Sequence, residues 1–335
     1  MQRNIKGKST LIVKSTGTWK LIEQNLQQDV PVMLLYVLES KGSSPGRQGF
    51  FMAVNSMGTM EGSIGGGIME HKFVELAKER LVNETDDLTK IKKQIHDKTV
   101  AKDQSGMICS GEQTIFLYRL QKGDLPAIQS IITALTQNKC GTLLLSPGGI
   151  GFDAAVPGQD FYFTMKSEED WEYSEKIGYK NELFIVGGGH CALALTKLMR
   201  PMDFYIRIYD DRKEVKTMAE NHDAHEKHFV SDYSELSELI VSGPNHYVVV
   251  MTVGYRTDDT AMKALFGKEF RYFGLLGSRF KVNKMMSEYR SNGVSEEVLQ
   301  TIHAPAGIQI KSESPEEIAV SIAAEIISIK NQPSP

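Results

Sequence analysis

The stretch 183-LFIVGGGHCA-192 decides the fold of the C-terminal half of this 335-residue chain. An apolar run typical of a buried strand leads directly into three glycines, and a helical pattern follows at 191–199. In such a turn, Gly187 permits the tight bend, Gly189 lets a phosphate approach the backbone, and Ala192 keeps helix and sheet close. Amides at the start of the helix then face the anion. The stretch predicts the first strand–turn–helix unit of a nucleotide-binding Rossmann-like domain.

The residues after this turn continue the pattern. Strand and helix segments alternate at 204–209, 213–220, 246–252 and 271–276, which indicates a parallel sheet with helical crossovers. Two acidic residues end the second strand, about where a carboxylate commonly holds the ribose of an adenine nucleotide. We expect NAD(P) or another adenine nucleotide to contact Gly187, Gly189, His190, Asp210 and Asp211. The alternative is that the glycines only shape the turn and hold no ligand.

The N-terminal half mixes helices and strands without this alternation. Helices are predicted at 16–28, 68–82 and 125–137, and strands at 32–38, 50–54, 90–96 and 113–120. Polar and acidic residues without apolar periodicity occupy 157–181. We therefore expect an α/β protein in which a mixed α+β domain (1–165), a linker (166–180) and the Rossmann-like domain with its parallel sheet (181–335) follow one another.

Composition and charge argue against several classes of protein. The net charge is −4 and no segment concentrates Lys and Arg, so nucleic acid is not an expected partner. The longest apolar run, at 31–38, is far shorter than the roughly 20 residues that span a bilayer, and the N-terminus does not resemble a signal peptide. Three cysteines, an odd number, argue against a disulfide framework. We expect a cytoplasmic protein with no membrane contact.

Several separate motifs spread over nearly the whole chain are similar to those of the XdhC/CoxI family of xanthine dehydrogenase accessory proteins. In the N-terminal half they are GSSPG at 42–46, GSIGGG at 62–67 with Glu70 following, and GMICSG at 106–111. In the C-terminal half they occupy 186–190, 209–212, 274–281 and 304–319. The order of these matches carries the resemblance.

Three positions depart from the family pattern or divide its branches. Ser110 stands where the family usually has glycine, and Val253 follows Thr252 where the family often has histidine. A role that rests on that histidine is therefore in doubt. Ile68 stands where the carbon monoxide dehydrogenase branch often has cysteine. In this respect the chain resembles the xanthine dehydrogenase branch better.

The resemblance implies an accessory protein that does not itself oxidise purines. Such a protein binds molybdenum cofactor transiently, supports its sulfuration and inserts it into a xanthine dehydrogenase-type molybdenum hydroxylase. The implied partners are this hydroxylase, a cysteine desulfurase and a second copy of the chain in a homodimer. The chain has too few cysteines for the iron–sulfur clusters of the hydroxylase itself.

A carrier of a sulfur-rich molybdenum centre on a phosphorylated pterin needs a thiolate and anion-binding groups. Cys109, in a glycine-flanked loop, is the candidate thiol and molybdenum contact, although a free cysteine is also commonly a small buried side chain. A rigid turn with a planar cation and a glycine turn before a helix are candidates for the phosphate or the pterin edge, and turn chemistry alone explains both equally well. These two segments consist of Ser44, Pro45, Gly46 and Arg47, and of Gly65, Gly66 and Gly67.

Two other functions are compatible with the sequence. An NAD(P)-dependent oxidoreductase would use the Rossmann-like domain for hydride transfer, and a nucleotide-sensing protein would dock on the hydroxylase without carrying its cofactor. His222, His225 and His228 lie close together but have no acidic or cysteine partner at ligand spacing, so we interpret them as a solvated surface. Cys191 and Cys140 are interpreted as packing or incidental residues.

Overall fold

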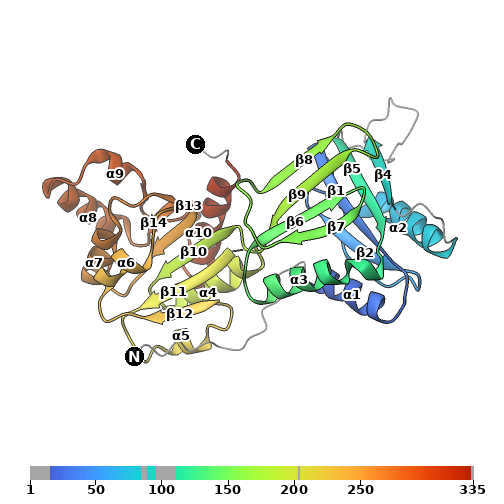
Figure 1. Cartoon of the computed structure of the whole chain (residues 1–335). Coiled ribbons are helices and arrows are strands. Elements are labelled where there is room, and N and C mark those ends of the chain that lie inside the picture. Colours follow the sequence, from blue (N-terminus) through green and yellow to red (C-terminus); the bar gives the residue numbers. More distant parts are fainter. Residues whose placement is uncertain (1–15, 84–88, 96–110, 203, 333–335) are drawn as a thin grey trace. The chain divides into compact units, whose positions relative to one another are not determined.

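The computed structural model describes residues 16–83, 89–95, 111–202 and 204–332. They belong to two compact units, an N-terminal and a C-terminal unit, which join between Gly178 and Tyr179 (Figure 1). In the described part of the chain, no helix has both the length and the apolar composition needed to cross a bilayer. Among the described residues, the N-terminal unit has two sheets and the C-terminal unit has one, and each unit has its own hydrophobic clusters.

The central strand of the N-terminal unit, β1 (Val32–Gly42), is apolar on both faces because each face meets a different layer. Its residues Leu34 and Tyr36 belong to a cluster with helix α1 (Thr16–Gln27), whereas Met33 and Leu35 pack in a cluster with helix α2 (Gly67–Val82). Successive side chains of a strand point to opposite faces, which explains why the run is almost continuously hydrophobic. The antiparallel sheet has the order β3-β2-β1-β5-β4. Its other strands are β2 (Phe51–Asn55), β3 (Met60–Gly62), β4 (Thr89–Ile95) and β5 (Gly111–Arg119).

A second antiparallel sheet, with the order β7-β6-β9-β8, completes the N-terminal unit. Its strands are β6 (Gly141–Ser146), β7 (Gly149–Asp153), β8 (Phe161–Met165) and β9 (Trp171–Ile177). Residues of β6 and β9 share one hydrophobic cluster with Phe116 of β5 and with helix α3 (Leu125–Thr136). Helices α1 and α3 lie side by side (Figure 1).

The predicted linker at 166–180 is wrong, because it contains strand β9. The polar run at 166–170 is the turn between β8 and β9, which the Lys166 amide closes by donating to the Asp170 carbonyl at 2.8 Å. Directly after it, Trp171 and Tyr173 are buried in the core. A polar turn between two strands lacks apolar periodicity just as a linker does, so composition alone could not distinguish the two.

The C-terminal unit contains a six-stranded parallel sheet with the order β12-β11-β10-β13-β14-β15. Numbered within the unit this order is 3-2-1-4-5-6, that of dinucleotide-binding Rossmann domains. The fold class predicted from the sequence is thereby confirmed. The strands are β10 (Asn181–Val186), β11 (Phe204–Asp210), β12 (Glu226–Phe229), β13 (Gly243–Val250), β14 (Phe270–Leu275) and β15 (Ile302–His303).

Helices cover both faces of this sheet. One hydrophobic cluster joins the strands to α4 (His190–Met199), the short α5 (Lys216–Glu220) and α10 (Pro315–Lys330). The other joins them to α6 (Leu236–Leu239), α7 (Tyr255–Leu265), α8 (Arg279–Ser291) and α9 (Glu296–Gln300). Because helices cover both faces of the sheet, the connecting loops lie at the ends of the strands. The Gly187 turn is the loop at the carboxyl end of β10.

The interpretation of the three histidines as a solvated surface is wrong for His228, which pairs with Glu226 at 2.8 Å and stacks on Tyr209, and it is wrong for His225. Its Nδ1 accepts from the Ile206 amide at 2.9 Å, its Nε2 lies 2.6 Å from the Tyr179 hydroxyl oxygen, and its ring stacks on Tyr205 at 4.4 Å. Burial lowers the pKa of His225 to about 3, and the charge of Arg200 beside the ring acts in the same direction. The ring is a neutral packing element of the C-terminal unit.

Acid is expected to destabilise the C-terminal unit through this histidine. Between pH 6.5 and about 3 the unfolded chain binds a proton at His225 and the folded chain does not, so the free energy of unfolding rises with pH in this window. Going from pH 7 to pH 5 should cost about 2 kcal/mol. Urea unfolding at both pH values measures the loss, which His225→Gln should reduce and His190→Gln, at an exposed position of the same unit, should not. An equal loss in all three proteins contradicts the assignment.

Candidate functional site

The Gly187 turn has the backbone geometry that the sequence predicts. Gly187 has a φ of +104°, and a Cβ atom there would lie 2.4 Å from the Met251 carbonyl oxygen. Only glycine fits, because both the left-handed backbone and the close approach to the end of β13 exclude a side chain. The turn therefore lies directly against the carboxyl ends of β10 and β13, where the strand order reverses.

Gly189 and His190 form the open side of the turn. Gly189 is the N-cap of α4, and a Cβ atom built on it would meet no atom within 4 Å. His190 is exposed, and the α4 amides begin beside it. The backbone can therefore be approached by a phosphate as expected, and occupancy by a nucleotide stays a prediction.

The other side of the turn is closed by α5. A Cβ atom on Gly188 would lie 2.3 Å from the Met218 side chain, and the Thr217 hydroxyl donates to the Gly188 carbonyl. Cys191, one residue into α4, is half-buried. Burial, together with the Glu316 carboxylate, raises the pKa of its thiol, which agrees with a packing role.

Asp210, the predicted ribose contact, is fully buried and bonded within the protein. Its Oδ2 accepts from the Gly188 amide at 2.6 Å and from Arg212 Nη2 at 2.7 Å, and its Oδ1 accepts from the amide and Nε of Arg212, both at 2.9 Å. Burial by itself would raise the pKa of Asp210, but these bonds more than offset it and the pKa is lowered. The accessible charges at the end of β11 are Asp211 and Arg212, whose side chains are 30% and 42% exposed.

A buried polar cluster that the sequence did not reveal joins the ends of β13 and β14. Asp258 of α7 has no exposed surface and accepts from the Thr252 amide at 2.9 Å and from its hydroxyl at 2.6 Å. Lys281 of α8 donates to the Asp258 carboxylate and, at 2.9 Å, to the Leu276 carbonyl. In the sequence, the only sign of this cluster was that Lys281 belongs to one of the family-like motifs. Val253, which stands in place of the family histidine, is 73% exposed.

The structure brings together the two N-terminal segments proposed for anion binding. A Cβ atom on Gly46 would lie 2.0 Å from the Ile64 carbonyl oxygen, and one on Gly65 would lie 2.5 Å from the Gly46 amide nitrogen. Gln113 of β5 donates to the carbonyls of Gly46 and Ile64 at 2.9 and 3.3 Å. The 44–47 loop can therefore pack closely on the turn before α2 only because neither Gly46 nor Gly65 has a Cβ atom.

The amides of this turn already have an anion, the carboxylate of Glu70. One of its oxygens accepts from the Ile64 and Gly66 amides, both at 2.9 Å, and from the Ser63 hydroxyl at 2.7 Å. Burial by itself would raise the pKa of Glu70, but the bonds from Ser63 and the backbone lower it. The amides of Ile64 and Gly66 thus do not fit a second anion while Glu70 accepts from them, and the Gly65 amide donates to the Ser63 hydroxyl oxygen at 3.1 Å.

The remaining N-terminal candidates differ in their exposure. Ser44 is buried and donates to the Gly46 carbonyl at 3.0 Å, so it shapes the loop. Arg47 is exposed, with one bond of 3.2 Å from Nη1 to the Gly42 carbonyl. Cys109 lies outside the described residues. In the part of the chain with described positions, no three His, Cys, Asp or Glu residues gather as metal ligands.

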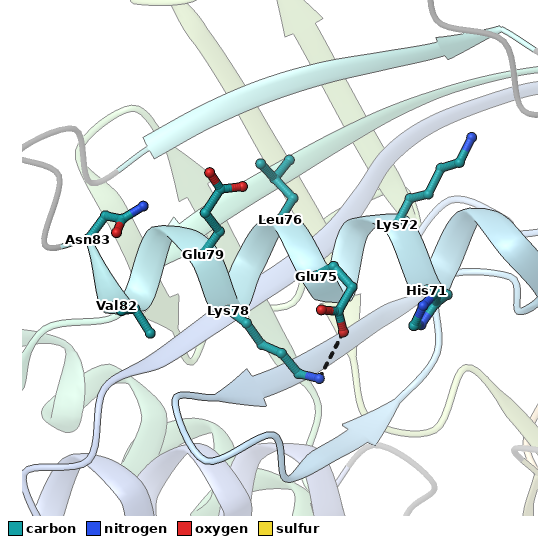
Figure 2. Close-up of a pocket in the computed structure, with 8 residues that line it drawn as sticks. All are labelled: His71, Lys72, Glu75, Leu76, Lys78, Glu79, Val82 and Asn83. Carbon is teal, nitrogen blue, oxygen red and sulfur yellow. Dashed lines mark hydrogen bonds and ion pairs between the residues drawn. The ribbon is translucent and has the colours of Figure 1, made fainter.

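A hollow of about 720 Å³ borders helix α2, and none of its lining residues is a candidate predicted from the sequence. Figure 2 shows that its side chains do not converge: Lys72 and Glu79 point to one side of the helix, and Lys78 to the other, where it pairs with Glu75 at 2.9 Å. Ligand sites are concave and mostly apolar. This hollow is the charged outer surface of one helix.

Two family models match the chain. One, described as the XdhC Rossmann domain, matches residues 183–326, and the other, described as the XdhC and CoxI family, matches residues 25–90. The first match falls within the C-terminal unit and the second within the N-terminal unit.

Individual proteins are also similar to this chain. The chain is 24% identical to the uncharacterized protein YqeB of Escherichia coli over 318 residues, which cover 94% of this chain and 46% of YqeB. It is 29% identical to a Bacillus subtilis protein described as a probable xanthine dehydrogenase subunit over 160 residues, 48% of this chain and 46% of that protein. The matches thus span less than half the length of these curated relatives.

A solved structure shares the fold over most of the chain. It is a crystal structure of a Bacillus halodurans protein described as a xanthine dehydrogenase, with a TM-score of 0.69 and 21% identity. The likeness covers 93% of this chain and 95% of that one.

Proposed function

Because the chain belongs to the XdhC and CoxI family, we propose that it is an accessory protein of a xanthine dehydrogenase-type molybdenum hydroxylase. In this proposal it binds molybdenum cofactor, supports its sulfuration in contact with a cysteine desulfurase, and inserts it into the hydroxylase. The protein acts as a homodimer and does not itself oxidise purines. The ordered matches to the two family models, one in each compact unit, are the observation that carries the proposal.

The residues of the N-terminal unit suit this cofactor in part. When bound, the cofactor supplies a phosphate and a sulfur-ligated molybdenum centre. The exposed guanidinium of Arg47 suits the phosphate, since a planar cation pairs with it through parallel hydrogen bonds. In the turn before α2, the Gly66 amide does not suit it, because this amide donates to Glu70. Cys109 is proposed as the thiolate beside the molybdenum.

Replacing Cys109 with alanine is expected to remove most of the bound molybdenum cofactor, because a soft metal centre prefers a thiolate ligand. The measurement is the molybdenum and pterin content of protein purified from cells that make the cofactor. Cys140→Ala is the matched control, since Cys140 is a partly buried thiol beside strand β6. Equal cofactor content in the two variants would remove Cys109 from the proposal.

The C-terminal unit supports an additional role in binding an adenine nucleotide. Its strand order is that of dinucleotide-binding domains, and the backbone at Gly189 is open to a phosphate. The same observations favour an NAD(P)-dependent oxidoreductase as the second candidate function. Following NADH absorbance during incubation with candidate substrates separates the two, because an accessory protein produces no turnover.

A further inference from the structure

The end of β11 presents the guanidinium of Arg212 and the partly exposed carboxylate of Asp211, whereas the carboxylate of Asp210 is already paired. A free ribose 2′-hydroxyl is commonly held by a carboxylate at the end of the second strand. Here the carboxylate of Asp210 has no exposed surface, and each of its oxygens already accepts two hydrogen bonds, from Arg212 and Gly188. A ribose hydroxyl could reach it only by displacing a paired guanidinium.

Arg212 is held in place by this pairing and remains accessible. Its Nε and Nη2 donate to the two oxygens of Asp210, so the plane of the guanidinium is fixed. A guanidinium has five N–H groups, and these bonds use two of them. The side chain is 42% exposed, and Asp211 Oδ1 lies 4.0 Å from its Nε. The strand therefore ends in an anchored cation that faces solvent.

We propose that the nucleotide site of the C-terminal unit selects an adenosine that carries a 2′-phosphate, as in NADP(H), and that Arg212 contacts this phosphate. The inference rests on the proposed nucleotide-binding role of this unit. An arginine near the end of the second strand accommodates a 2′-phosphate in Rossmann domains, because it offers paired donors and a charge. The exposed Lys213 directly after Arg212 adds a second cation to the same loop.

The other charges of this loop are mostly negative, with three carboxylates and one lysine. Lys216 pairs with Glu220 at 3.5 Å on the surface of α5, and Glu214 is exposed. Asp211 is the one carboxylate next to Arg212 that is partly exposed, and it opposes a phosphate. If Asp211 instead held the ribose, the site would prefer a free 2′-hydroxyl. Whether the site prefers a nucleotide with a 2′-phosphate or one with a free 2′-hydroxyl therefore decides whether Arg212 or Asp211 makes the contact at this position.

The test compares two ligands that differ only in the 2′-phosphate. Isothermal titration calorimetry of the full chain with adenosine 5′-monophosphate and with adenosine 2′,5′-bisphosphate should give at least about tenfold tighter binding of the bisphosphate. Arg212→Gln should abolish this preference, because the amide can still donate to Asp210 but carries no charge. Arg290→Gln, at an exposed arginine that also pairs with a carboxylate, is the matched control and should retain it.

The outcomes distinguish failure of this inference from failure of the proposed nucleotide-binding role on which it rests. Equal binding of the two nucleotides, or tighter binding of the monophosphate, overturns the inference and leaves the nucleotide site standing. A preference that survives Arg212→Gln, in a variant whose circular dichroism matches the wild type, overturns the role of Arg212. Absence of binding by both nucleotides and by NADP+ overturns the inference together with the nucleotide role of the C-terminal unit.

Discussion

Replacing Lys281 with methionine should lower the free energy of unfolding of the C-terminal unit by about 3 to 5 kcal/mol. The variant leaves the Asp258 carboxylate in the core without its cationic partner, and Asp258 has no exposed surface. Removing one member of a buried pair costs more than the pair contributes, because the remaining charge cannot be solvated. The Leu276 carbonyl also loses its donor. Urea unfolding followed by circular dichroism measures the change.

Two further variants make this result specific. Lys263→Met removes an exposed lysine of α7 that pairs with Asp259 at 2.7 Å, and it should change stability by no more than about 0.5 kcal/mol. The double variant Asp258→Asn with Lys281→Met should regain most of the stability, because it buries no charge. If Lys281→Met behaves like Lys263→Met, the buried ion pair does not exist in solution.

The second large effect is expected at Gly46 of the N-terminal unit. Gly46→Ala should cost about 3 kcal/mol or more, at the upper end of the range for overpacked sites. The new Cβ atom would lie 2.0 Å from the Ile64 carbonyl oxygen, and no rotamer can relieve a clash between Cβ and backbone. It would also disturb the bond from Gln113 to the Gly46 carbonyl. Thermal or urea unfolding measures the loss.

Gly123→Ala is the matched control for this substitution. Gly123 lies in the same unit, and a Cβ atom there would meet nothing within 4 Å. The free energy of unfolding of Gly123→Ala should therefore be close to that of the wild type. Similar stabilities of Gly46→Ala and Gly123→Ala would mean that the 44–47 loop does not pack on the turn before α2.

Local signals in the sequence predicted the fold well where one segment determines its own structure. The Gly187 turn is an example, since an apolar strand, a left-handed glycine and a helix start are all encoded within ten residues. The linker at 166–180 was wrong because a polar hairpin turn and a polar linker have the same composition. Helices α7 and α8 were not predicted, so the pairing of Asp258 in α7 with Lys281 in α8 was missed.

The candidate site shows where sequence spacing stops being informative. Spacing placed Asp210 correctly at the end of the second strand, but it could not reveal that Arg212 occupies its carboxylate. In the same way, the glycines before α2 indicated free amides, whereas Glu70 in the first turn of the helix accepts from the amides of Gly66 and Ile64. In both cases an internal side chain takes the bond that the motif would otherwise offer to a ligand.

The two faces of β1 have a consequence for how the N-terminal unit opens. Leu34 and Tyr36 belong to one hydrophobic cluster and Met33 and Leu35 to the other, so the same backbone holds both. Separating either layer from the strand exposes apolar surface, and releasing the strand breaks both layers at once. Local opening would therefore propagate to the whole unit, and the two layers act as a single cooperative unit of unfolding.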